Sequence, residues 1–246
     1  MAGSPRPAFF VSCEDEMPAI AGLFNGVATL TAVPLIAVPL HVLYLSQRLD
    51  AKKDPMLVSL LTCFCVTLTC LFCTNLIQHA VGGLSSVRAH EAMAAVQALF
   101  NAAMINALRH RSGFRSVVDE QGLAMALAGT VMVVHTTLTH PDKYLEPVCG
   151  AVQLLTAPLI VCTMGAFSWR GDARAWRLFV RSCIGLVLVP LAVGVEKQMC
   201  GLGSPWLARG YHAVIDHSAI WCLFGGVGQN AVHLVGLSLL PKQREV

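Results

Sequence analysis

The sequence predicts an all-α integral membrane protein, a seven-transmembrane-helix bundle that forms one domain from residue 1 to residue 246. Of the 246 residues, 55% are hydrophobic and only 13% are charged, whereas an average soluble domain carries roughly 25% charged residues. The mean hydropathy is +0.64, so lipid is the expected solvent. The sequence has no basic stripe with interleaved aromatic residues, and nucleic acid is therefore excluded as an expected partner.

Seven apolar segments are each long enough to cross a bilayer, which takes about 20 residues. They are residues 20–46, 56–80, 89–108, 122–139, 147–168, 177–196 and 212–240. The third is the weakest, because it is rich in alanine and carries His90 and Glu91. Proline occurs within the first, fifth and sixth segments, and membrane helices tolerate it because neighbouring groups satisfy the freed carbonyls.

The basic residues predict which side of the membrane each connection faces. If the connections alternate, twelve of the 17 Lys and Arg residues fall on one side and five on the other. Connections rich in Lys and Arg stay in the cytosol. We therefore expect residues 1–19 on the lumenal or extracellular side and the tail 241–246 in the cytosol. Six or eight spans would break this alternation.

Polar side chains converge at the lumenal end of the predicted bundle. The groups come from the end of the second span, the start of the third and the start of the seventh: Asn75, His79, His90, Glu91, His212, Asp216, His217, Ser218 and Cys222. Ionisable groups inside a membrane are costly and indicate a functional site by default. Taken singly, each histidine is more simply explained as an interfacial or hydrogen-bonding residue. Their convergence from separate spans favours a shared site.

The chemistry of this layer predicts a zinc hydrolase. His and Cys are the usual zinc ligands, and a catalytic zinc takes three protein ligands and leaves a fourth position for water. Zinc lowers the pKa of that water to about 7, which gives a nucleophile at neutral pH. A lipid amide or ester is the expected kind of substrate, and the lipid bilayer is the expected surrounding.

Two cysteines on the predicted lumenal side are candidates for a disulfide. Cys13 precedes the first span and Cys200 follows the sixth, and this side of a membrane permits oxidation. Cys149 lies near the same face and is a competing partner.

Two parts of the sequence resemble the alkaline ceramidase family. Residues 13–16, Cys-Glu-Asp-Glu, and residues 20–25, Ile-Ala-Gly-Leu-Phe-Asn, are similar to the family's Cys-Glu-Glu-Asn-Tyr and Ile-Ala-Glu-Phe-Trp-Asn. The family's last span reads His-x-x-Trp-His and then Gly-x-Gly, which resembles residues 221–222, Trp-Cys, and residues 226–228, Gly-Val-Gly. The resemblance extends loosely along most of the chain.

The resemblance implies a seven-helix enzyme that hydrolyses ceramide to sphingosine and a fatty acid. It implies that His79, His217 and Cys222 bind zinc, with Cys222 in place of a family histidine. The family's other histidine in this span aligns with Ser218, or with His217 if the register shifts by one residue. We expect a ceramide-like membrane lipid as the substrate, and a multi-pass location in the endoplasmic reticulum or Golgi membrane.

Further roles are implied by the resemblance at positions where this chain differs from the family. Asn75 stands in place of a serine and would polarise the substrate carbonyl. His90 stands in place of an aspartate and would handle a proton of the zinc-bound water or bind metal itself. Glu14 and Glu16 correspond to a calcium site near the N-terminus.

The resemblance also supports the disulfide between Cys13 and Cys200, because the family's cysteines at these two positions are implied to pair. The same replacements fit a protein that kept the fold and lost the chemistry. The alternative function is therefore a catalytically inactive lipid-binding or receptor-like protein. A transporter is disfavoured, because transporter sites lie near the bilayer midplane and these polar residues lie near one face.

Overall fold

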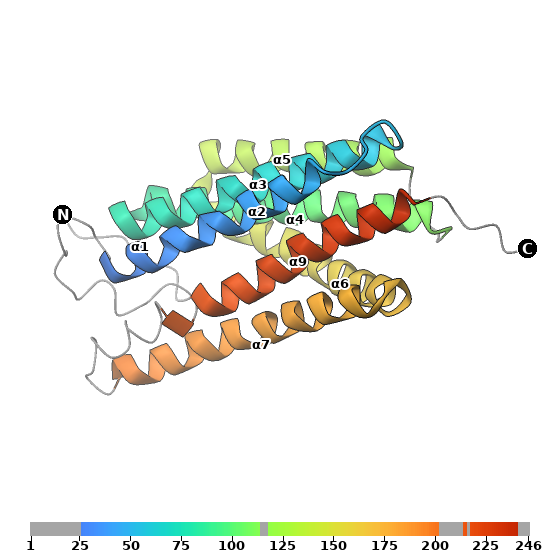
Figure 1. The fold of residues 1–246 in the computed structure, drawn as a ribbon. Helices are drawn as coiled ribbons and strands as arrows, with labels where there is room; N and C mark the ends of the chain where they lie inside the picture. Colours follow the sequence, from blue (N-terminus) through green and yellow to red (C-terminus); the bar gives the residue numbers. More distant parts are fainter. Residues whose placement is uncertain (1–25, 114–117, 202–213, 216, 241–246) are drawn as a thin grey trace, which may run out of the picture.

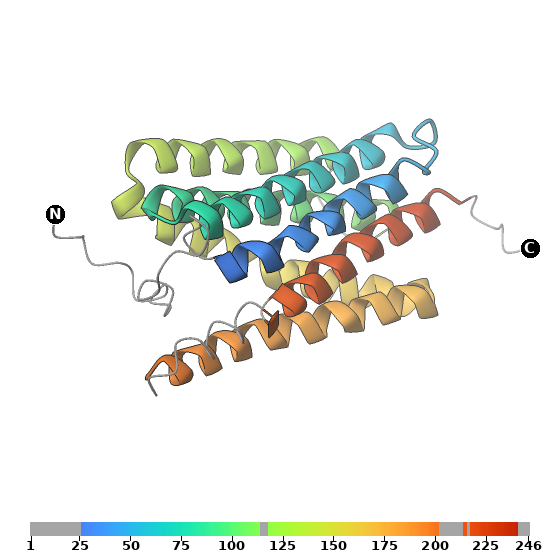
Figure 2. The same cartoon turned by 60° about the vertical axis from the view of Figure 1, so that its left-hand side comes forward.

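The computed structural model describes residues 26–113, 118–201, 214–215 and 217–240, and the regular structure in these ranges is helical. The first helical segment consists of α1 (Gly26–Ala32), the 3-10 helix η3 (Val33–Ile36) and α2 (Ala37–Ser46), which follow one another without a break. The later elements are α3 (Pro55–Val81), α4 (Leu84–Arg111), α5 (Asp119–Thr139), the short π-helix η4 (Pro141–Leu145), α6 (Glu146–Gly171), α7 (Ala173–Gly201) and α9 (His217–Ser238). The long helices run side by side, with α5 and α7 on opposite sides of the bundle (Figure 1, Figure 2).

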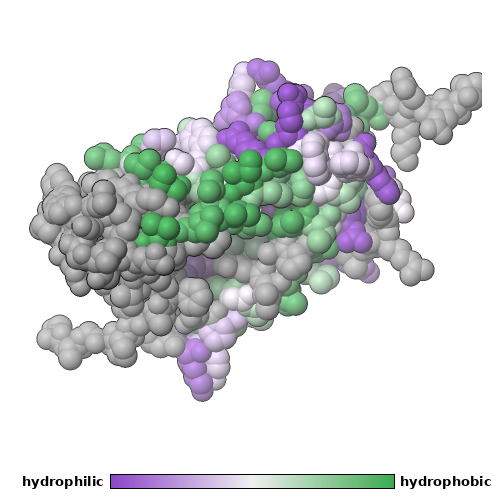
Figure 3. Space-filling model, turned by 90° about the horizontal axis from the view of Figure 1, so that it is seen from below, coloured by the Kyte–Doolittle hydropathy of each residue, from purple (hydrophilic) through white to green (hydrophobic). Residues whose placement is uncertain are grey.

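Within the described ranges, four helical segments are long and apolar enough to cross a membrane: Thr29–Ser46, Pro55–Val81, Asp119–Thr139 and His217–Ser238. α5 also exposes large apolar side chains, among them Val131 and Leu138. Hydrophobic side chains form a continuous area across the middle of one face (Figure 3). Exposed apolar surface of this extent is typical of contact with lipid, so the predicted membrane character is supported. The count of seven crossings and their orientation stay predictions.

α4 lies at the centre of the packing, where it contacts α3, α5, α6 and α9. Its buried face is rich in alanine, including Ala92, Ala95, Ala103 and Ala107. Small residues let helix backbones approach closely inside a membrane. The weak hydropathy of residues 89–108 has a physical reason here, because α4 is surrounded largely by protein and can carry polar side chains between helices.

The Gly226-Val227-Gly228 motif packs α9 against two neighbours. A Cβ atom at Gly226 would lie 2.8 Å from the backbone oxygen of Leu178 on α7. A Cβ atom at Gly228 would lie 2.7 Å from a methyl carbon of Val42 on α2. Both separations are shorter than real Cβ contacts, so glycine at these positions fixes how α9 sits between α7 and α2.

One end of the bundle is held by part-buried charges, and we call it the Arg111 end. Here α4, α6 and α9 finish, and α3, α5 and α7 begin. The Arg111 guanidinium donates hydrogen bonds to the carboxylates of Asp54 and Asp119, including one of 2.7 Å from Nη2 to Asp54 Oδ1. Asp54 also accepts from the backbone N–H of Leu57 and so caps α3. The Arg111 hydrogen bond holds the pKa of the Asp54 carboxyl below its ordinary value.

A second contact at the Arg111 end ties α9 to the start of α7. Asp172 Oδ1 accepts from the backbone N–H of Ala175 at 2.7 Å, and Asp172 Oδ2 lies 2.6 Å from Nε2 of His233. The backbone hydrogen bond from Ala175, followed by the one to His233, lowers the pKa of Asp172. A separate buried hydrogen bond joins α9 to α6, from Asn230 Nδ2 to Ser168 Oγ at 2.7 Å.

Candidate functional site

The structure brings together two of the histidines that the sequence singles out. His79 lies in the last turn of α3, and His217 is the first residue of α9. Their ring centroids are 5.3 Å apart, with the ring planes at 69°. The two residues are only 5% and 4% exposed. We call them the histidine pair, and their approach from two helices is a geometry in which imidazoles can share a metal ion.

Thr31 on α1 orients the ring of His217. The Thr31 hydroxyl and His217 Nδ1 are joined by a hydrogen bond of 2.7 Å. Because Thr31 engages Nδ1, a metal ion bound by His217 would be bound through Nε2, which is how an outer hydrogen bond selects the ligating nitrogen. Sequence reasoning missed Thr31, since nothing distinguishes it from threonines such as Thr62 and Thr69, whose hydroxyls bond to carbonyls of their own helix.

Asn75 lies one turn from His79 on the same face of α3, because residues four apart on a helix are neighbours. It is 8% exposed, and within the described part of the chain its Oδ1 has no hydrogen-bond partner. An amide can both accept and donate hydrogen bonds. Asn75 is therefore suited to bind a polar group of a ligand that reaches the histidine pair.

The other predicted residues of α9 point away from the pair. Cys222 is five residues after His217, which places it about 140° around the helix, and it is half-buried. Ser218 is exposed, and its hydroxyl donates to the carbonyl of Val214 at 2.5 Å. The α9 residue that faces His79 is thus His217 and not Ser218.

His90 and Glu91 lie near the start of α4, where both are half-buried. Across the described ranges, no three His, Cys, Asp or Glu residues are grouped closely enough to hold a metal ion. A catalytic zinc needs three protein ligands. The histidine pair offers two imidazoles of this kind, and both the zinc site and its third ligand stay predictions.

Several predicted residues lie outside the described part of the chain. These are Cys13, Glu14 and Glu16, together with the side chain of Cys200. The calcium site and the Cys13–Cys200 disulfide therefore stay predictions. Cys149, the competing disulfide partner, is buried on α6 as a free thiol.

A cavity of about 310 Å³ lies between α3, α4, α6, α7 and α9, and we call it the central cavity. Its walls are mainly hydrophobic, with Ile160 and Met164 from α6, Phe179 and Leu186 from α7, and Val227 from α9. Ligand pockets are typically concave and mostly apolar, with a few polar groups. The lining of the central cavity suits a hydrocarbon chain.

The central cavity begins two turns from the histidine pair. Leu71 on α3 and Phe224 on α9 are part of its lining, and they lie eight and seven residues from His79 and His217. These separations are about 12 Å along α3 and about 10 Å along α9. Phe224 also packs edge to face against Phe72, with ring centroids 5.5 Å apart.

In comparisons with known proteins, no family model, curated protein or solved structure matches the chain.

Proposed function

We propose that the protein is a membrane-embedded, zinc-dependent lipid amide hydrolase of the ceramidase type. Its substrate would place the scissile amide at the histidine pair and a hydrocarbon chain in the central cavity. The observation that carries the proposal is the approach of the buried His79 and His217 rings, 5.3 Å apart, from α3 and α9. The ceramidase-like sequence motifs supply the reaction class, with ceramide yielding sphingosine and a fatty acid.

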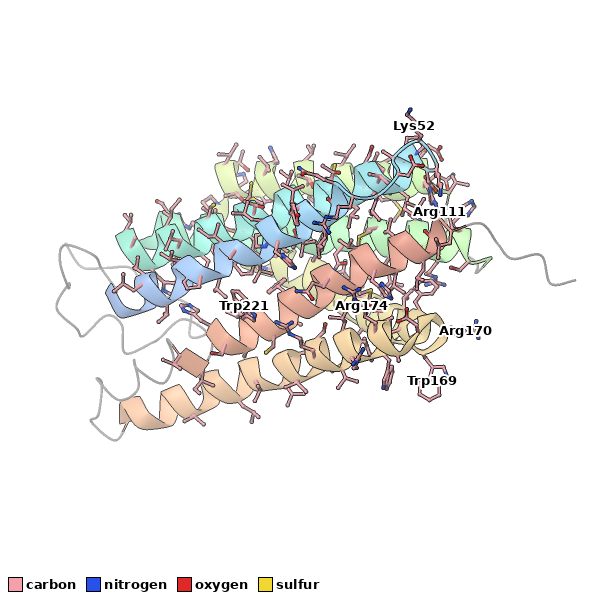
Figure 4. All side chains as sticks on the ribbon, viewed as in Figure 1. Lys52, Arg111, Trp169, Arg170, Arg174 and Trp221 are labelled. Atoms are coloured by element: carbon pink, nitrogen blue, oxygen red, sulfur yellow. The ribbon has the colours of Figure 1, made fainter. Side chains whose placement is uncertain are left out.

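The proposal includes seven membrane crossings, a lumenal N-terminus and a cytosolic C-terminus. Figure 4 supports it, because Lys52, Arg111 and Arg170 lie at one end of the bundle. Trp169 and Trp176 pack edge to face near this end, with ring centroids 5.2 Å apart. Basic residues favour the cytosolic side, and tryptophan favours the membrane interface. A location in the endoplasmic reticulum or Golgi membrane is part of the same proposal.

His79, His217 and Cys222 would hold the zinc ion. Bound zinc supplies a water of pKa about 7 as the nucleophile. Thr31 would keep His217 oriented for binding through Nε2. The described contacts support the two histidines, whereas Cys222 lies on another face of α9, so its contribution is tested separately below.

Other residues would position the substrate. His79, Asn75 and Leu71 are spaced four residues apart and share one face of α3, and Leu71 lines the central cavity. This face offers a route from the histidine pair to the cavity, along which Asn75 would donate to the substrate carbonyl. His90 would exchange a proton with the reacting water. Glu14 and Glu16 would bind calcium in the N-terminal segment.

A second function, lipid binding without hydrolysis, is favoured by one observation. On α3 and α9, the lining of the central cavity ends at Leu71 and Leu223, about two turns from the histidine pair. A lipid chain held there would need its head group to extend past these side chains to reach the histidines. The two functions differ in whether the protein binds zinc and cleaves an amide.

Metal content and amide cleavage, measured on the same preparations, test the proposal. The full chain is purified in mild detergent, its zinc is quantified per chain, and sphingosine release from a long-chain ceramide is followed. The variants are His79→Ala, His217→Ala and Cys222→Ala. His41→Ala is the matched control, because His41 is an exposed histidine on α2.

We expect about one zinc per chain and sphingosine release in the parent and in the control. Both should be lost in the two histidine variants. Zinc retained in Cys222→Ala would assign the third ligand to another residue. A folded parent without zinc and without ceramide cleavage would contradict the hydrolase proposal and support lipid binding alone.

A further inference from the structure

Two polar side chains stand out in the lining of the central cavity. Gln97 and Asn101 are four residues apart on α4 and line the cavity together. They are 3% and 8% exposed. Two other polar side chains in the lining, Thr156 and Ser182, have hydroxyls that donate to carbonyls of their own helices. Gln97 and Asn101 have no such local acceptor.

The hydrogen bonding of this pair is incomplete within the described part of the protein. The hydroxyl of Thr67 on α3 lies 2.5 Å from Oε1 of Gln97, which holds the amide in place. Nε2 of Gln97 and Oδ1 of Asn101 have no hydrogen-bond partner among the described residues. Buried polar groups in folded proteins are nearly always hydrogen-bonded, so two buried amide atoms without a partner, in side chains that line a cavity, indicate a ligand that satisfies them.

The two amide atoms define what that ligand offers. Nε2 is a donor and Oδ1 is an acceptor, and the two residues are one helical turn apart. A hydroxyl group satisfies both, because its oxygen accepts from Gln97 and its proton is donated to Asn101. The surrounding side chains, such as Ile160, Met164 and Phe179, are apolar and suit the hydrocarbon part of a ligand.

We propose that the central cavity binds the hydrocarbon chain of one lipid molecule and that Gln97 and Asn101 recognise a hydroxyl group on that chain. Gln97 is about 10 Å along α4 from His90, so the pair is too far from the histidine layer to take part in bond cleavage. The recognition goes beyond the proposed hydrolysis and does not depend on it. In a hydrolase it would select substrates with a hydroxylated chain, and in a binding protein it would select the bound lipid.

Binding of stearic acid and its monohydroxy isomers tests the proposal. The full chain in lipid nanodiscs is titrated with stearic acid and with isomers that carry the hydroxyl at successive positions along the chain. The same titrations use Gln97→Met/Asn101→Leu, which keeps the side-chain size and removes the polar atoms. Gln229→Met is the matched control, because Gln229 on α9 does not line the cavity.

We expect at least one hydroxy isomer to bind the parent about tenfold more tightly than stearic acid, as two new hydrogen bonds permit. The double variant should lose this preference and still bind stearic acid, whereas the control should keep the preference. Equal affinities for all isomers in the parent, or a preference that persists in the double variant, would overturn the proposal.

A second variant separates the subsite from the fold and from catalysis. Ala98→Phe places a large side chain at a residue that lines the cavity, so it should abolish binding of both kinds of fatty acid. The hydroxyl preference should survive in His79→Ala, since that variant leaves the cavity intact. Undiminished binding to Ala98→Phe would show that the fatty acids bind elsewhere and would also overturn the proposal. If the double variant does not fold, the single variant Asn101→Leu replaces it. We expect this variant to show a reduced preference for the hydroxy isomer, and an unchanged preference would contradict the proposal.

Discussion

The two ends of the bundle bury polar side chains in different ways. At the Arg111 end, the Arg111 guanidinium meets the carboxylates of Asp54 and Asp119, so each of these part-buried charges has an opposite charge beside it. At the other end, the two imidazole rings of the histidine pair pack edge to face, and a hydrogen bond joins His217 Nδ1 to the hydroxyl of Thr31. Charge pairs of the first kind tie helices together. Convergent, chemically versatile groups of the second kind indicate function, because the membrane interior makes them costly to keep.

The difference explains why counting polar residues does not locate a site. His233 and His217 both lie on α9, yet His233 bonds to the helix-capping Asp172, whereas His217 meets a second histidine. The partner, and not the residue type, separates a structural histidine from a candidate ligand. Four predictions, ordered by expected size, test this division of the bundle.

Removal of the central charge at the Arg111 end should cause the largest loss of stability. Arg111→Leu leaves Asp54 and Asp119 close together without a counter-charge, and we expect the free energy of unfolding to fall by about 3 kcal/mol. Denaturant unfolding in detergent measures this change. Lys52→Ala is the control, because Lys52 is exposed in the connection before α3, and it should change the free energy by roughly 0.5 kcal/mol or less. Equal effects of the two variants would show that the charge pairs do not stabilise this end.

The contact of α7 with α9 should be the next most sensitive feature, since α9 links the two ends. Gly226→Ala adds a Cβ atom 2.4 Å from the Ser182 hydroxyl oxygen and 2.8 Å from the Leu178 carbonyl oxygen. We expect a loss of about 1–3 kcal/mol in unfolding free energy. Gly150→Ala is the matched control, because a Cβ atom there meets nothing within 4 Å, and it should be neutral or stabilising. A neutral Gly226→Ala would contradict the close approach of the helices.

Loss of the Thr31 hydroxyl should weaken metal binding with little effect on the fold. Thr31→Val keeps the shape of the side chain and removes the hydrogen bond to His217. We expect zinc affinity to fall by about tenfold and the unfolding free energy to change by about 1 kcal/mol or less. A zinc competition titration measures the first quantity, and Thr31→Ser should restore it. Unchanged affinity in Thr31→Val would show that Thr31 does not orient a metal ligand.

The two ends of the bundle should respond to acid at different pH values. The pKa of Asp54 is below its ordinary value of 3.8, so its stabilising contribution is fully present above 3.8 and is lost only as the pH falls through the lower, folded-state value. Bound zinc should dissociate at a higher pH than this, because protons compete with metal for imidazole nitrogen. Zinc content and tryptophan fluorescence, followed in one acid titration, measure both transitions. Simultaneous loss of zinc and of the fold would contradict the separation.

The sequence predicted the course of the helices well. The apolar stretch 56–80 corresponds to α3 at Pro55–Val81, and 122–139 corresponds to α5 at Asp119–Thr139. Hydrophobic length and turn residues decide these boundaries locally. The approach of His79 to His217 was also predictable, because alternating spans bring the end of α3 and the start of α9 to the same level.

Other parts of the site depend on rotation of helices about their axes, which the sequence leaves open. The resemblance to the ceramidase motif implied that Cys222 and His217 share a metal ion, yet five residues along a helix correspond to about 140° around it. The roles of Thr31, Gln97 and Asn101 depend on which neighbour each side chain meets, and polar residues in an apolar span give no such information. The central cavity arises from side-chain packing of five helices, so it becomes visible only in three dimensions.

The most direct test compares His79→Gln with Arg111→Leu in one experiment. Zinc per chain, sphingosine release and unfolding free energy are measured on the same preparations of the full chain. If the histidine pair serves function and the Arg111 end serves stability, His79→Gln should lose zinc and ceramide cleavage while its unfolding free energy stays close to that of the parent. Arg111→Leu should lose stability, while its folded fraction keeps zinc binding and ceramide cleavage. A His79→Gln variant that retains zinc and cleavage, or that loses only stability, would contradict a functional role for the histidine pair.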